Sequence, residues 1–257
     1  MKKWIIPAIL FLTLLGITAW MTSLGSVGVF RMAPAGRVLT ATWKHLQLVL
    51  AAEILAILVG VPIGFMLTRR SFRAVGPIIM GIVNIGQTVP TLALIGIVTL
   101  LLGMGFTAAL VGLFIYALLP IVRNTYAGIL SVDPAIKEAS LGMGMTKSQV
   151  TLRVELPLAR PVLIAGIRTS TVVNVGTAAV AGMIGAGGLG ELIMTGLAVR
   201  VTEMILQGAA PAAALAIALD ALLGGVEAWM TPRGLRRTST STKRQRKTRS
   251  VLADGSL

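Results

Sequence analysis

The chain has 257 residues, of which 55% are hydrophobic and only 12% are charged, and its mean hydropathy is +0.88. A soluble domain of this size needs more charge to cover its surface, so the composition excludes an ordinary soluble enzyme and is typical of a membrane protein. The absence of cysteine and the single histidine, His45, exclude disulfides and a multi-histidine metal site within one chain. Residues 233–257 contain eight Lys/Arg and one acid, which supply half of the formal charge of +14.

Six apolar stretches each approach the roughly 20 residues that a helix needs to cross about 30 Å of hydrocarbon. We therefore expect an all-α, polytopic membrane protein with about six transmembrane helices. The first stretch exceeds the apolar region of a signal peptide and no A-x-A-like cleavage site follows it, so we expect a retained helix, with a cleaved signal peptide as the alternative. The predicted spans are Trp4–Leu24, Leu46–Leu67, Val75–Leu102, Phe106–Tyr126, Pro157–Ile184 and Met204–Met230.

The basic residues between the spans predict the topology. With both termini inside, the cytoplasmic side has nineteen Lys/Arg residues, counting Arg168 near the start of the fifth span, and the outer side has four. The positive-inside rule therefore favours an N-in, C-in protein. We divide the chain into an N-terminal helix with an external loop (1–39), a membrane domain (40–229) and a basic, disordered cytoplasmic tail (230–257). For the tail we expect attraction to anionic lipid and no binding of nucleic acid.

One polar insert, Glu138 to Pro161, lies on the cytoplasmic side between the fourth and fifth spans. Asp133 can cap a first short helix with Pro134 in its first turn, and Gly142 and Gly144 supply its end. Paired start and stop signals favour a docking element, and a merely solvated loop is the alternative.

A second short helix is predicted to begin directly after this glycine pair. The residues from Thr146 to Gln149 fit a capping box, and Pro157 ends the polar part where the next span begins. The two helices together would form a rigid lever between two membrane spans.

The insert resembles the cytoplasmic loop of permease subunits in binding-protein-dependent ABC importers, whose pattern is E-A-A, three residues, Gly, nine residues, Ile, one residue and Leu-Pro. Every spacing is kept, with Ser140 in place of Ala and Val154 in place of Ile. The resemblance implies a type I ABC importer permease fold in which the loop, residues 132–157, couples transport to a separate cytoplasmic ATPase. The residues that match the coupling motif are Glu138, Ala139, Ser140, Gly144, Leu156 and Pro157.

No phosphate-binding G-x-x-x-x-G-K-[ST] loop and no enzyme motif occurs in the sequence, so we expect neither an enzyme nor a cofactor in this chain, with ATP bound by the partner. The glycine-rich run Gly185–Gly190 lacks the βαβ context of a dinucleotide site. We expect it to form an external hinge before a short helix near Glu191–Leu197.

Further segments look like the osmoprotectant branch of this family, over roughly residues 40–229. That branch imports glycine betaine, carnitine, choline or related solutes across a bacterial inner membrane, with an extracytoplasmic binding protein and a second permease copy or paralogue. Permeases for amino acids such as methionine share the architecture, and an ion-coupled secondary carrier is a less favoured alternative. The segments are Asn84–Leu94, Leu118–Thr125, Ala165–Thr169, Val175–Ala179 and Ile184–Gly190.

Polar residues inside the spans suggest a translocation path, because lipid tolerates such groups only against protein or a water-filled cavity. Interhelical hydrogen bonding is the alternative for each of them. The candidates are Asn84, Gln87, Thr88, Pro90, Asn174 and Thr177.

Two acids, Glu53 and Asp220, also lie within spans. Each suits either a cationic headgroup in the path or an ion pair with Arg168 or a partner subunit. Because the aromatic residues form no compact cluster for a quaternary ammonium group, we expect selectivity to reside mainly in the binding protein.

Overall fold

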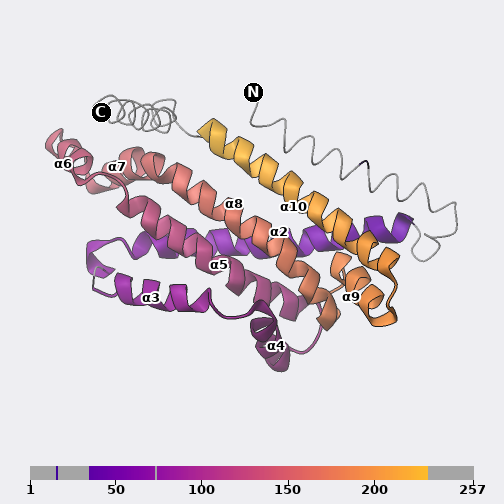
Figure 1. Cartoon of the computed structure of the whole chain (residues 1–257). Coiled ribbons are helices and arrows are strands. Elements are labelled where there is room, and N and C mark those ends of the chain that lie inside the picture. Colours follow the sequence, from indigo (N-terminus) through magenta and orange to yellow (C-terminus); the bar gives the residue numbers. More distant parts are fainter. Residues whose placement is uncertain (1–15, 17–34, 73, 231–257) are drawn as a thin grey trace, which may run out of the picture.

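The computed structural model describes residue 16, residues 35–72 and residues 74–230, and these ranges form helices without a strand (Figure 1). The all-α prediction is therefore confirmed for this part of the chain, whereas the predicted first span and the basic tail after Met230 lie outside it. The elements are α2 (Ala35–Met66), η2 (Arg70–Phe72), α3 (Gly76–Gly86), α4 (Thr91–Leu102), α5 (Phe106–Leu130), α6 (Pro134–Gly142), α7 (Lys147–Val150), η3 (Thr151–Glu155), α8 (Leu156–Val180), η4 (Ala181–Ile184), α9 (Leu189–Val199) and α10 (Thr202–Met230).

Three of these helices, α2, α5 and α10, are each long and apolar enough to cross a membrane. Two further spans are bent pairs: α3 with α4, and the helix Lys147–Ile184 with α9. If each pair is one span, this part of the chain has five, which is the number predicted after the first span.

The pair α3–α4 differs from the single, polar-interrupted span predicted over Val75–Leu102. The two helices meet at 97°, because the residue before a proline is driven out of the helical region and Pro90 then starts α4 with extended ψ. The Thr88 hydroxyl and the Thr88 N–H both donate to the Ile85 carbonyl, at 2.7 and 2.9 Å, and so close the end of α3.

The segment after the polar insert also differs from the prediction. The helix that begins at Lys147 does not stop at Pro157 but runs on into α8 through one π-helical turn, η3. In that turn the Leu156 N–H donates to the Thr151 carbonyl, five residues back. Because Pro157 has no N–H to offer, the wider turn lets the chain pass the proline while the helix continues. The loop therefore consists of one short helix, α6, and the first turns of a long helix that begins at Lys147 and continues into α8.

Close helix contacts organise the centre of the bundle. Gly60 and Gly64 of α2 form a small-xxx-small pair against α5, where a Cβ at Gly64 would lie 2.7 Å from the Val122 carbonyl oxygen. Gly166 of α8 lets α5 approach equally closely, because a Cβ at this position would overlap the Cβ of Asn124. Figure 1 shows the result: α5 and α8 lie side by side, α2 crosses behind them, and α10 covers the other side of α8.

Candidate coupling loop and charged pocket

The local signals of the coupling loop are present as predicted. The Asp133 carboxylate accepts from the Ala135 N–H at 2.8 Å, and Pro134 opens α6. The helix ends at Gly142, and Gly144 has φ +84°, a left-handed conformation that suits glycine. Thr146 and Gln149 then exchange both hydrogen bonds of a capping box, at 3.3 and 2.8 Å, which starts α7.

The residues of the coupling motif differ in exposure, and Gly144 is exposed. Glu138 and Ala139 are exposed on α6, whereas Ser140 is buried and its hydroxyl donates to the Ile136 carbonyl at 2.7 Å. The added hydroxyl, in place of the family's alanine, is thus satisfied within its own helix. Leu156 and Pro157 are half-buried at the start of α8.

Beneath α6 lies an ion cluster that the sequence reasoning missed. Glu155 is buried, and its two oxygens accept from Arg69 at 2.7 Å and from Lys137 at 3.2 Å. Lys137 also donates to the Ile129 carbonyl at the end of α5, at 3.3 Å, and Arg69 lies over the ring of Phe65, 3.9 Å from its centroid. The Glu155 carboxylate therefore links the start of α8 to Arg69, which follows α2, and to Lys137 of α6. Lys137 in turn links α6 to the end of α5.

The six predicted path residues do not share one environment. Asn84, Thr88 and Pro90 are exposed around the α3–α4 break, and the side-chain amide oxygen Oε1 of Gln87 accepts from Arg123 of α5 at 3.5 Å. Asn174 and Thr177 are instead buried within the protomer, on α8. The structure thus places these two away from open surface.

Glu53 explains the burial of Asn174. Its carboxylate lies between α2 and α8, where it accepts from the Asn174 amide at 3.2 Å and from the Ser170 hydroxyl at 3.3 Å. Arg168, the ion-pair partner considered for it, bonds to other acids. Glu53 is therefore a buried interhelical acceptor in this protomer, and Ser170 is a partner that the sequence did not distinguish from its polar neighbours Thr169 and Thr171.

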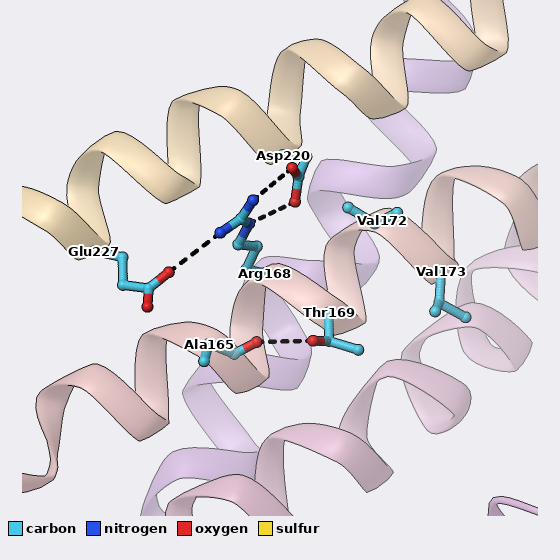
Figure 2. Close-up of a pocket in the computed structure, with 7 residues that line it drawn as sticks. All are labelled: Ala165, Arg168, Thr169, Val172, Val173, Asp220 and Glu227. Atoms are coloured by element: carbon cyan, nitrogen blue, oxygen red, sulfur yellow. Dashed lines mark hydrogen bonds and ion pairs between the residues drawn. The ribbon is translucent and has the colours of Figure 1, made fainter. Parts of the chain in front are cut away.

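Arg168 and Asp220 form the ion pair that was one of the two alternatives. Figure 2 shows the Arg168 guanidinium bridging two carboxylates of α10: Nη2 donates to Asp220 Oδ2 at 2.6 Å, and Nη1 donates to Glu227 at 3.3 Å. Arg168 was counted with the cytoplasmic residues, but it lies well inside α8 because this pairing stabilises its charge there.

These three side chains border a pocket of about 410 Å³ between α8 and α10 (Figure 2). The rest of its wall is small and mainly apolar, from Ala165, Thr169, Val172 and Val173. In the described ranges, no group of three or more acidic or histidine side chains is placed to hold a metal ion.

Comparison with known proteins agrees with this geometry. Residues 60–234 match the family described as "Binding-protein-dependent transport system inner membrane component". The choline transport system permease protein OpuBB of Bacillus subtilis (strain 168) is 46% identical over 208 residues, which are 81% of this chain and 95% of that protein. The glycine betaine/carnitine/choline transport system permease protein OpuCB of the same organism is 45% identical over 206 residues, 80% of this chain and 94% of that protein.

The fold is similar to that of a chain in an inward-facing structure of the MetNI methionine ABC transporter. The TM-score is 0.67 at 24% identity, over 76% of this chain and 97% of that one. The expected type I importer permease fold is thereby confirmed. The chain belongs to the family of inner-membrane components of binding-protein-dependent transport systems.

Proposed function

We propose that this chain is the permease subunit of an ATP-driven importer for a small quaternary ammonium osmoprotectant such as choline, glycine betaine or carnitine. The observation that carries the proposal is the similarity to two relatives named for these solutes, at 45–46% identity over at least 80% of this chain and 94% of theirs. The membrane spans and the coupling loop are the parts that such a subunit needs.

The motor of this importer is a separate ATPase, to which the exposed residues Glu138 and Ala139 of α6 dock. Figure 1 shows α6 at one end of the helical bundle, and both residues are exposed there. An extracytoplasmic binding protein delivers the solute at the opposite end, and a second copy or a paralogue completes the path, because the spans of one chain enclose little space.

Two groups of residues contribute differently to that path in our proposal. Asn84, Gln87, Thr88 and Pro90 line it at the bend between α3 and α4, where the exposed polar backbone requires water or protein. Asn174 supports its wall from inside the protomer through the contact with Glu53, and Thr177 is buried less than one turn further along α8.

Reconstitution of the whole importer tests the proposal. The permease, its ATPase and its binding protein are incorporated into liposomes, and ATP-dependent uptake of labelled choline, glycine betaine and carnitine is compared with uptake of methionine. We expect uptake of at least one quaternary ammonium solute and little uptake of methionine. Uptake of the amino acid alone would overturn the osmoprotectant proposal and leave the family intact.

An amino-acid permease is the second candidate, and the likeness of fold to the MetNI chain favours it. That likeness is at 24% identity, well below the 45–46% of the two osmoprotectant relatives. An ion-coupled carrier would transport solute in the same liposomes without ATP, so omission of ATP separates this third possibility.

A further inference from the structure

The outward surfaces of α2 and α8 have different chemistry. Along α2 the exposed positions are large and apolar at four-residue spacing, as at Leu50, Ile54 and Leu58. Along α8 the exposed positions are Arg160, Thr169, Val173 and Gly176, of which only Val173 is a large apolar residue. A surface of large apolar side chains suits lipid, whereas small and polar positions are typical of contacts with protein or water.

The charged pocket lies on the α8 side of the bundle. The side chains of Arg168, Asp220 and Glu227 are 36%, 35% and 29% exposed. Arg168 lies about 18 Å along α8 from its start at Leu156, and Asp220 lies about 15 Å from the end of α10. Charged groups this far inside spanning helices face a bundle interior or a water-filled cavity, because lipid does not solvate them. The pocket therefore opens to the water-filled or partner-covered side of the subunit.

The pocket offers both charges to a ligand. Two carboxylates and one guanidinium give it a net charge of −1, and its remaining wall is mostly apolar. A quaternary ammonium zwitterion has a methylated cation, which carries its charge without donating hydrogen bonds, and an anionic end that suits a guanidinium. A volume of about 410 Å³ is in the range of small-molecule pockets.

We infer that the pocket of Arg168, Asp220 and Glu227 is a binding site on the translocation path for the charged ends of a quaternary ammonium solute. This inference rests on the proposed function. The carboxylates attract the ammonium group, and Arg168 exchanges its longer bond, at 3.3 Å to Glu227, for the anionic end of a zwitterion such as glycine betaine. None of the residues that line the pocket is aromatic, so charge replaces cation–π attraction and the solute is held weakly enough to pass.

A cysteine at Thr169 tests the site directly. The residue lines the pocket and is exposed, and the native chain has no cysteine, so all labelling of this subunit arises from the new thiol. The T169C variant is assembled with its partners in liposomes without choline lipids. Its reaction with a trimethylammonium-bearing methanethiosulfonate is compared with its reaction with the sulfonate-bearing reagent, each relative to a free thiol.

We expect the cationic reagent to react at least about tenfold faster, because the net negative charge of the pocket concentrates cations and repels anions. Choline and glycine betaine should each slow the labelling. Glu227→Gln should bring the two rates close together, whereas the matched control Glu191→Gln, in an exposed pair with Arg37 outside the pocket, should leave the preference unchanged.

Equal rates for the two reagents, no reaction at all, or no protection by either solute would overturn the inference. Uptake by the same T169C liposomes before labelling separates this failure from failure of the proposed function. Uptake of choline or glycine betaine without a charge preference at residue 169 would reject the pocket and keep the osmoprotectant importer. Absence of such uptake in the native importer would reject the proposed function itself.

Discussion

Substitution of Glu155 by glutamine would test whether the ion cluster beneath α6 holds the coupling loop in place. Glutamine keeps the shape of the side chain but removes the charge that Arg69 and Lys137 share. Both cations then face a neutral amide, and α6 loses the contact that ties Lys137 to the start of α8.

The expected cost follows from burial. Loss of one partner from a fully buried ion pair costs about 3–5 kcal/mol. Here the Glu155 side chain is 8% exposed but its partners are 33% and 25% exposed, so both cations can turn partly to water. We therefore expect about 2 kcal/mol, which corresponds to an increase of about 30-fold in the equilibrium constant for local opening of α6.

Hydrogen exchange of the assembled importer measures this opening. Amides of α6 should exchange about 30-fold faster in Glu155→Gln, whereas amides of α9 should keep their rates. The matched control is Glu191→Gln, whose pair with Arg37 is exposed at 3.5 Å and should contribute less than about 1 kcal/mol. Unchanged exchange in α6 would show that the cluster does not hold the helix and would refute the reasoning.

Three further substitutions test the loop and the path. Gly144→Val should lower transport through loss of ATPase association or coupling. No atom lies within 4 Å of a Cβ at this position, but a valine at φ +84° costs about 1–2 kcal/mol of backbone strain. Normal uptake and normal ATPase binding would contradict this expectation. Glu138→Lys should leave insertion intact but reduce the solute transported per ATP hydrolysed in liposomes, and an unchanged ratio would make Glu138 only a surface residue. Thr88→Cys, exposed at the α3–α4 bend, should react with a small polar thiol reagent at a rate that changes when ATP is added. The buried Thr177→Cys should react slowly with and without ATP. Equal rates with and without ATP at position 88 would remove that residue from the proposed path.

The features that the sequence predicted well are those whose causes are local. Asp133 caps α6 from two residues away, and Thr146 and Gln149 act across a single turn. The turn at residue 144 has a positive φ, and a positive φ favours glycine independently of the helices that pack around the turn. The apolar spans were likewise predictable, because hydrocarbon thickness sets their length.

The features that the sequence did not predict depend on distant partners. Glu155 meets Arg69 across 86 positions, and the pair of Arg168 with Asp220, across 52 positions, could be named only as one of two alternatives. Hydropathy shows that an acid lies inside a span but not which helix faces it, so Glu53 was not assigned to Asn174. The polar residues around Pro90 indicated an interruption of the span, but not that its two halves would meet at 97°.

The geometry connects the coupling loop to the charged pocket through one continuous helix. Lys137 turns inward to Glu155, while its neighbour Glu138 is exposed on the surface that we assign to the ATPase. Glu155 leads directly into α8, which has no break before Arg168, about 20 Å further along. A displacement of α6 by the motor would therefore move the start of α8 through the ion cluster, and the rigid helix would carry that movement to the pair with Asp220. For this reason we expect access to the pocket to depend on the nucleotide state of the ATPase, and Glu155→Gln to weaken that dependence without any contact with the solute.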